Sequence, residues 1–415
     1  MNKPMPNRSL SDLMREATRL TQTGQLAEAQ AALQQALGAG AAAAFPGPGA
    51  HPAAGPATGS FPGMGSTAAP AAWSAQLRDA ATAWAKSGGQ GPVIDMADLA
   101  NLPGLGGAAP GPNAGSASSE PAVPDSFSTG SLSHGGRSWR YKLYVPPAAA
   151  TATPQAPLPL VVMLHGCTQH ADDFAAGTGM NALARAQGCY VLYPEQPQAA
   201  NPQRCWNWFK HNHQQRGSGE PAGIVALVQA VAASHPVDPR RVYVAGLSAG
   251  GAMTAIVAAA YPDVFAAAGV HSGLPGDAAG NLQEALAAMQ GGARGPSTQA
   301  RTPRPARPVP TIVFHGDQDG TVHLHNGHQL LAAALAGAPA ELRSQLSEGQ
   351  APGGRRFSRQ HHAGADGRSH AELWVVHGAG HAWSGGQPAG SYTDAGGPDA
   401  SAEMLRFFSQ HQLPG

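Results

Sequence analysis

The sequence is poor in cysteine, in charged residues and in long apolar runs. Its 415 residues include three cysteines, Cys167, Cys189 and Cys205. This small, odd number does not make the disulfide framework of a secreted scaffold, and it favours a reducing compartment. The amino-terminal segment MNKPMPNRSLSDLMREATRL lacks the apolar core of a secretory signal, and no segment resembles a membrane-spanning helix. We therefore expect a cytoplasmic protein; the alternative is an extracellular protein exported without a recognisable signal peptide.

An excess of charge of one sign is also missing. The 25 basic and 25 acidic residues cancel, so no long-range field favours binding to nucleic acid or to an anionic membrane surface. A neutral or apolar substrate suits this balance better. Glycine and proline are abundant by contrast, with 54 and 37 residues, which indicates that part of the chain is of low complexity.

The amino-terminal third of the chain differs in composition from the rest. Apolar residues recur at helical spacing within residues 1–38 and predict a helical hairpin. Residues 39–125 are rich in Ala, Gly, Pro and Ser, which bury too little apolar surface to offset the entropy of ordering, and we interpret them as a linker. Within it, Trp73 and Trp84 would share one face of a short amphipathic helix. That face either anchors the protein to an apolar surface or, as we favour, packs on the domain expected at residues 126–415.

The expected domain alternates short apolar segments with helical ones. Such a rhythm is typical of a mostly parallel β-sheet with helices on both faces, whose central strands are apolar throughout. A half-buried strand, WRYKLYVP, comes first. The apolar segments that follow are residues 160–166, 189–194, 241–246, 266–273, 311–317 and 372–378.

The strongest local signal is GLSAG, residues 246–250, between the apolar strand RVYVA and a helical segment. A strand that turns sharply into a helix exposes a serine at the turn, and small residues two places before and after it make room for the strained backbone. Gly246 and Gly250 fill those places around Ser248. The pattern also occurs by chance in flexible glycine-rich turns, but here both flanks match. We predict an α/β-hydrolase domain with Ser248 as its nucleophile.

A serine nucleophile needs a base and a group that orients the base. In this fold the acid and then the histidine follow the serine along the chain. We expect Asp319, deep in the loop after the strand TIVFHG, to be the acid, with Asp317 as the alternative. The base is expected to be His381, in the glycine-flanked loop after ELWVVHG, whereas His377 ends that strand and is expected to be structural.

Acyl transfer also requires donors for the oxygen that becomes negatively charged. In this fold the amide after the nucleophile supplies one, and a loop after an early strand supplies another. We expect the amides of Ala249 and of Cys167, in LHGCTQ, to form this oxyanion hole. Loss of one such donor typically costs about 3 kcal/mol of transition-state stabilisation.

No metal or other cofactor is expected. His323, His325 and His328 have a spacing that metal ligands also show, but no paired acidic or cysteine motif accompanies them. We therefore interpret this histidine cluster as unrelated to metal binding.

Six motifs together resemble the polyhydroxybutyrate depolymerase family of esterases, which includes feruloyl and acetylxylan esterase relatives. They are LHGCTQ, LYPEQ, CWNWF, VDPRRVYVAGLSAGGAM, HGDQDGTV and GAGHAWSGG, and the resemblance covers roughly residues 130 to 411. It implies hydrolysis of short hydroxyacid polyesters, or of aryl and acetyl esters, without a cofactor. It further implies that Trp206, Trp208 and Trp383 lie near the substrate cleft. Cys167 and Cys205 both fall in family motifs; they either form a disulfide or remain reduced thiols.

These observations lead to one expected function and two alternatives. The expected function is serine-dependent hydrolysis of hydroxyacid polyesters or oligomers through an acyl-enzyme. The first alternative is a feruloyl or acetylxylan esterase. The second is a protein that binds a granule or a protein partner through its amino-terminal helices while the hydrolase domain is idle, although a binding module does not need a serine, an acid and a base in catalytic order.

Overall fold

The computed structural model describes residues 125–293, 295, 307–336, 338 and 341–414. The hairpin expected at residues 1–38 lies outside the described residues, and so do the linker up to residue 124 and its tryptophan-bearing helix. These expectations therefore stay predictions.

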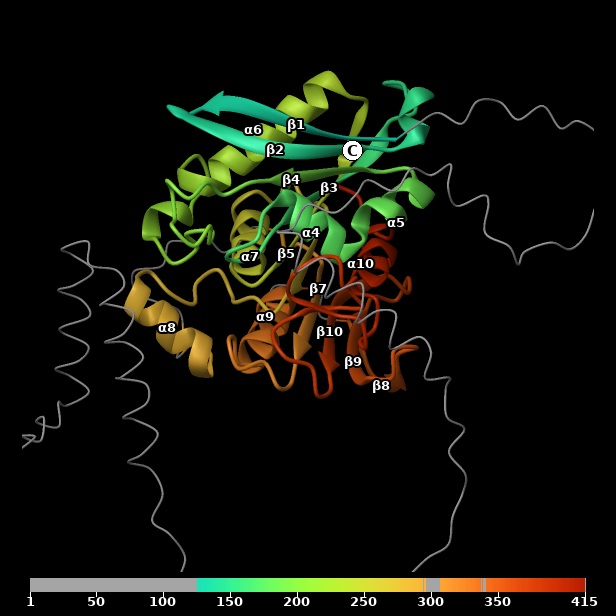
Figure 1. Cartoon of the computed structure of the whole chain (residues 1–415). Helices are drawn as coiled ribbons and strands as arrows, with labels where there is room; N and C mark the ends of the chain where they lie inside the picture. The colour runs from blue at the N-terminus through green and yellow to red at the C-terminus, as the bar shows by residue number, and fades with distance from the viewer. Residues whose placement is uncertain (1–124, 294, 296–306, 337, 339–340, 415) are drawn as a thin grey trace, which may run out of the picture. The chain divides into compact units, whose positions relative to one another are not determined.

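One ten-stranded sheet organises this unit (Figure 1). Six neighbouring strands run parallel and coincide with the six apolar segments of the sequence, and an antiparallel pair extends the sheet at each edge. In spatial order, the strands are β1 (Ser126–His134), β2 (Arg137–Val145), β4 (Tyr190–Pro194), β3 (Leu158–Leu164), β5 (Val237–Leu247), β6 (Ala267–His271), β7 (Thr311–Gly316), β10 (Ser369–Val376), β9 (Arg356–Ala363) and β8 (Arg343–Gln350).

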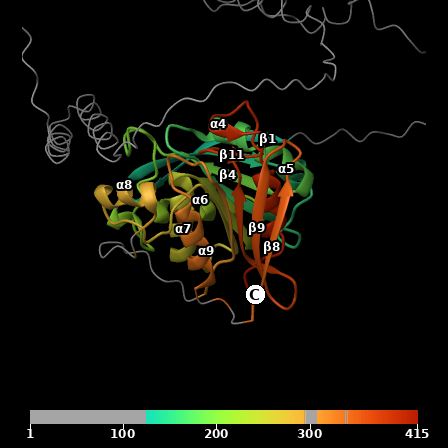
Figure 2. The ribbon, with the colours of Figure 1, turned by 90° about the horizontal axis from the view of Figure 1, so that it is seen from below.

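Helices cover both faces of the sheet (Figure 2). One face carries α6 (Gly219–Ser234), α7 (Ala249–Ala260), α8 (Leu282–Gly291) and α9 (His325–Leu335). The other carries α4 (Ala171–Thr178), α5 (Met180–Gln187) and α10 (Ala400–Phe408). None of the helices in the described ranges is long and apolar enough to cross a membrane.

The alternation of side chains along the strands divides the core into two layers. In β3, Leu160 and Val162 pack in the cluster that contains α6 and α7, whereas Val161 and Met163 pack with α4, α5 and α10. Successive side chains of a strand point to opposite faces, so a central strand buried on both faces must be apolar at every position. This is the physical reason why the six parallel strands are visible in the sequence. The mostly parallel α/β architecture predicted from the sequence is confirmed.

The parallel direction also places the ends of β3, β5, β6, β7 and β10 at one edge of the sheet. Ligands of open α/β sheets bind in the crevice outside the carboxyl ends of the strands. The loops after these five strands carry every catalytic residue predicted from the sequence. A short parallel pair, β11 (Trp383–Ser384) and β12 (Thr393–Asp394), follows the β10 loop.

Candidate active site

Ser248 stands between β5 and α7 in a strained conformation. Its backbone has φ 57° and ψ −119°, in the left-handed range that residues other than glycine rarely adopt. The backbone amide of Ser248 donates to the carbonyl of His271 at the end of β6, with an N···O distance of 2.9 Å. The residue is 9% exposed. A strained, nearly buried serine at a strand-to-helix turn has the features of a nucleophile elbow.

The two glycines of GLSAG are required by close backbone contacts. A Cβ on Gly250 would lie 2.0 Å from the carbonyl oxygen of Leu164, and a Cβ on Gly246 would lie 2.5 Å from the carbonyl carbon of Gly250. Contacts this short are not tolerated, so any larger residue would push the elbow away from the end of β3. The glycines therefore set the spacing between Ser248 and the loop that follows β3.

His381 and Asp319 are joined by a hydrogen bond. His381 Nδ1 lies 2.8 Å from Asp319 Oδ2, and the Asp319 side chain is fully buried. The other carboxylate oxygen, Oδ1, accepts from the amides of Thr321 and Val322 at 2.9 and 2.8 Å. Burial by itself would raise the pKa of Asp319, but the hydrogen bond and charge of His381 and the Val322 amide outweigh it, so the pKa is lowered. A carboxylate that accepts from Nδ1 leaves Nε2 as the nitrogen able to take a proton.

Asp317, the alternative acid, has a different partner. Its Oδ2 lies 2.9 Å from His377 Nδ1, and its Oδ1 accepts from the Gly378 amide at 2.7 Å. His377 Nε2 in turn lies 2.8 Å from the Ser358 hydroxyl on β9. His381 is therefore hydrogen-bonded to Asp319, whereas the hydrogen bonds of Asp317 join the loop after β7 to the loop after β10.

His271, a residue that the sequence analysis did not single out, connects the segments of the site. Its carbonyl accepts from Ser248, and its ring Nε2 accepts from the amide of Ser384, three residues beyond His381, at 2.9 Å. Burial, with the charges of His315 and His381, lowers the pKa of His271 to about 3, so its ring is neutral and remains an acceptor. In the sequence, His271 could have been recognised from its place at the end of the apolar strand that follows the Ser248 turn along the chain.

The loop after β3 lies beside the elbow and has an unused amide. The Cys167 N–H makes no hydrogen bond among the described residues. Ala249 is the first residue of α7, where an N–H has no partner within the helix. Both donors predicted for the oxyanion hole are therefore available at the sheet edge that carries Ser248.

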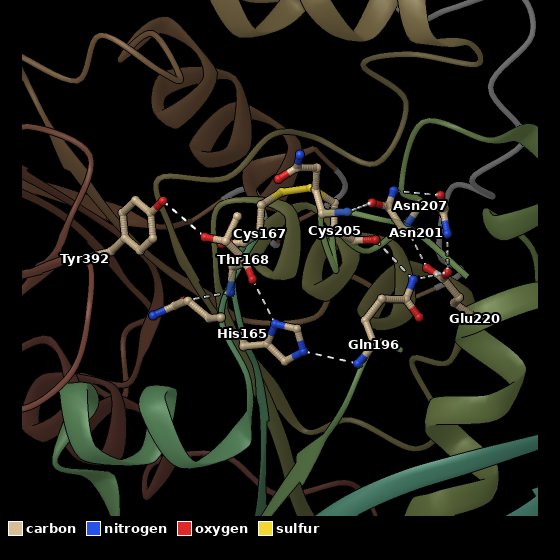
Figure 3. The surroundings of a disulfide bond; sticks show 12 residues. His165, Cys167, Thr168, Gln196, Asn201, Cys205, Asn207, Glu220 and Tyr392 are labelled. Carbon is tan, nitrogen blue, oxygen red and sulfur yellow. Dashed lines mark hydrogen bonds between the residues drawn. A yellow bond between two sulfur atoms is a disulfide. The ribbon is translucent and has the colours of Figure 1, made fainter. Parts of the chain in front are cut away.

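A disulfide joins Cys167 to Cys205 (Figure 3). The sequence left this pairing open, and a reducing compartment disfavours it. The bond ties the loop after β3 to the loop after β4. A further backbone hydrogen bond, from Thr168 N to the carbonyl of Gln203 at 2.6 Å, joins the same two loops. The Cys167 amide is thus fixed by a covalent bond on one side and by backbone contacts on the other.

A buried network of polar side chains is hydrogen-bonded to the same two loops. Gln196 donates from its backbone amide to His165 Nε2 at 3.1 Å and from its side chain to the Cys205 carbonyl at 3.1 Å (Figure 3). The fully buried Glu220 accepts from the Gln196 side chain and from the amide and side chain of Asn207. A buried carboxylate is stable only when its lone pairs are satisfied in this way. The network fixes the segment CWNWF rather than presenting it to solvent.

The three tryptophans expected near the substrate cleft are buried. Trp206, Trp208 and Trp383 are 0%, 5% and 1% exposed. Trp206 packs beside the ring of His165, and Trp383 packs against Phe174 and His271 while its Nε1 donates to Ser401. The contact of these rings with substrate stays a prediction.

The histidines of the 323–328 cluster lie at the start of α9 and in the turn before it. His323 Nδ1 accepts from the amide of His325, the first residue of α9. Within the described ranges, no group of three or more histidine, cysteine or acidic side chains is arranged to hold a metal ion.

The chemical capacity of the site follows from these contacts. A strained serine, a histidine oriented by a buried carboxylate and two free amides meet the needs of acyl transfer through a covalent intermediate. Together with the sheet order and the elbow, this defines an α/β-hydrolase domain.

Residues 139–338 match the sequence profile of the family described as esterase PHB depolymerase. The chain is 41% identical over 175 residues to poly(3-hydroxyalkanoate) depolymerase C of Paucimonas lemoignei, a match that covers 40% of this chain and 41% of that protein. It is 37% identical over 136 residues to feruloyl esterase B of Neurospora crassa, covering 32% of this chain and 44% of that protein. A probable acetylxylan esterase A of Aspergillus fumigatus is 34% identical over 138 residues, covering 32% of this chain and 34% of that protein.

These matches span less than half the length of each relative. Among solved structures, an acetyl xylan esterase from Aspergillus awamori aligns with a TM-score of 0.47 and 19% identity, covering 66% of this chain and 94% of that one.

Proposed function

We propose that this protein is a serine-dependent carboxylic ester hydrolase that acts on hydroxyacid polyesters or their oligomers. The observation that carries the proposal is the hydrogen bond between Asp319 and His381 at the sheet edge where Ser248 has its strained backbone. The similarity to poly(3-hydroxyalkanoate) depolymerase C of Paucimonas lemoignei supports the substrate class.

In the proposed mechanism, His381 Nε2 takes the proton of the Ser248 hydroxyl as Oγ attacks the ester carbonyl. The carbonyl oxygen becomes negative and is held by the amides of Cys167 and Ala249. The carbon–oxygen bond to the alcohol then breaks, and His381 gives its proton to the departing alkoxide. Asp319 holds the imidazole in the useful tautomer and stabilises its positive charge.

Water completes the cycle. His381 removes a proton from a water molecule, whose oxygen attacks the acyl carbon; the bond to Ser248 Oγ breaks, and His381 returns the proton to the serine. The products are one carboxylic acid and one alcohol, and no redox partner or metal takes part in any step.

The test is hydrolysis of p-nitrophenyl butyrate by the purified full chain. Ser248→Ala should lose almost all turnover while keeping its thermal unfolding temperature, because only the nucleophile is removed. Ser347→Ala, on an exposed position of β8, is the matched control and should retain wild-type activity. Equal activity in Ser248→Ala and wild type would refute the proposal.

Esterase activity on plant polysaccharide is the second candidate, because the chain also matches named feruloyl and acetylxylan esterases. Parallel assays with amorphous poly(3-hydroxybutyrate), methyl ferulate and acetylated xylan separate the candidates. We expect release of 3-hydroxybutyrate to exceed release of ferulate or acetate.

A further inference from the structure

A hollow lined mostly by residues with polar or charged side chains lies beside the loop that carries the predicted oxyanion donor. It holds about 330 Å³ and is lined by residues from β2, from the loop after β3 and from the loop after β4. A second hollow of about 310 Å³ shares His170, Gln198 and Arg204 with the first. A single hollow of this size is at the lower end of the range for small-molecule sites, about 300 to 1,000 Å³. It suits one small acid and not a polymer chain.

The charges in the lining leave one guanidinium without a partner. Glu195 is paired with Arg140 at 3.6 Å, so these two opposite charges compensate each other. The Arg204 side chain makes no hydrogen bond or ion pair within the part of the chain that the structure describes. The buried His165 contributes no charge, because burial lowers its pKa to about 4.

The backbone holds Arg204 in an unfavourable conformation. Its φ is 53°, in the left-handed range, which costs a residue other than glycine roughly 1 kcal/mol or more. Its amide donates to the Asn201 carbonyl at 2.8 Å, and the next residue, Cys205, is in the disulfide. The hydrogen bond and the disulfide hold the strained backbone of Arg204 in place. Strained residues held in this way cluster at active sites and ligand-binding sites.

The position of Arg204 relative to the site follows from the disulfide. The Cα atoms of Cys167 and Cys205 are 4.2 Å apart, and neighbouring Cα atoms are separated by about 3.8 Å. The Cα of Arg204 therefore lies within about 8 Å of the Cα of Cys167, whose amide is proposed to hold the ester oxygen. Arg204 therefore belongs to the immediate surroundings of the loop that bears the Cys167 amide.

We propose that Arg204 forms a subsite for the free carboxylate of a short hydroxyacid oligomer, so that the enzyme prefers the ester bond next to a carboxylate end. This inference rests on the proposed esterase function. A guanidinium binds a carboxylate through two parallel hydrogen bonds. The uncharged Gln198 and His165 leave that interaction without a competing acid, since Glu195 is occupied by Arg140.

The experiment compares two substrates that differ only at the end group: the linear dimer of 3-hydroxybutyrate and its methyl ester. The readout is the ratio of kcat/KM for the acid to kcat/KM for the methyl ester.

In the wild type we expect the acid to be preferred over the methyl ester. In Arg204→Gln the ratio should fall about tenfold, as expected for the loss of a hydrogen-bonded charge, and Arg204→Lys should retain part of the preference. Arg343→Gln is the matched control, because it removes an exposed guanidinium on the edge strand β8, at the opposite end of the sheet from β2 and β4, and the ratio should not change.

An unchanged ratio in Arg204→Gln would overturn the subsite while leaving the esterase function intact. Binding of 3-hydroxybutyrate itself, measured by calorimetry on wild type and Arg204→Gln, tests the subsite without turnover. Loss of binding in the variant supports the subsite, and equal binding refutes it. Failure of the wild type to hydrolyse p-nitrophenyl butyrate would instead refute the proposed function, so the two failures are distinguishable.

Discussion

The ring of His271 accepts a hydrogen bond from the backbone amide of Ser384, while the His271 carbonyl accepts from Ser248. One residue of β6 therefore holds both Ser248 and the segment that follows His381. Because β6 lies between β5 and β7 in the sheet, this residue spans the gap between Ser248 and the loops that carry Asp319 and His381.

Replacement of His271 tests this link. In His271→Leu the Ser384 amide loses its acceptor, and an unsatisfied buried donor costs about 1–3 kcal/mol. We expect a lower kcat with little change in KM, because the misplaced base acts on the chemical step. His271→Gln keeps an acceptor oxygen and should recover part of kcat. Steady-state kinetics with p-nitrophenyl butyrate checks this, and wild-type kcat in His271→Leu would contradict it.

Buried histidines predict that the protein loses stability in mild acid. Burial lowers the pKa of His165 to about 4, of His271 to about 3 and of His411 to about 4. Between these values and about 6.5, the unfolded chain binds protons that the folded chain does not. The free energy of unfolding should therefore fall as pH decreases below about 6.5.

Urea denaturation between pH 7.5 and pH 5 measures this dependence. His411→Phe removes one titrating group whose ring packs beside Phe407, so the slope of unfolding free energy against pH should decrease by up to about 1.4 kcal/mol per pH unit. A slope that is identical in wild type and variant would show that His411 does not contribute.

The two aspartates of the loop after β7 offer a matched comparison. Asp319→Asn removes the negative charge that orients His381, and we expect kcat to fall roughly 10³-fold or more. Asp317→Asn keeps an oxygen able to accept from Gly378 and leaves the Asp319–His381 pair in place, so its kcat should fall far less. Kinetics on both variants, with circular dichroism to verify folding, decides the matter. A larger loss in Asp317→Asn would reverse the assignment of the acid.

The sequence predicted those features that depend on local pattern. The parallel strands were visible because burial on both faces demands continuous apolar residues, and the elbow around Ser248 was visible because its glycines stand at fixed offsets. Asp319 was preferred over Asp317 from its depth in the loop, and the hydrogen bond to His381 agrees with that preference.

Features that depend on neighbours distant in sequence were missed. The role of His271 follows from the order of strands in the sheet, which local pattern does not specify. The edge strand β8 is polar and exposed, so it carries no alternation that would mark it as a strand. The burial of Trp206 follows from the closure of the CWNWF segment by the Gln196–Glu220 network, and no local pattern distinguishes a buried indole from one that lines a cleft.

The disulfide between Cys167 and Cys205 should support both folding and catalysis. It closes a segment with a sequence separation of 38, for which chain entropy predicts about 4 kcal/mol of stabilisation. In Cys205→Ser, or after dithiothreitol treatment, we expect a lower unfolding temperature and a lower kcat, because the loop that bears the Cys167 amide loses its covalent attachment.

The third cysteine provides the control. Cys189 is buried, which raises its pKa to about 12, so Cys189→Ala should show the same response to dithiothreitol as the wild type. Unfolding temperature and p-nitrophenyl butyrate kinetics, each with and without reductant, measure the effect. Identical values in the reduced and oxidised wild type would mean that hydrogen bonds such as that from Thr168 to Gln203 hold the loop without the disulfide.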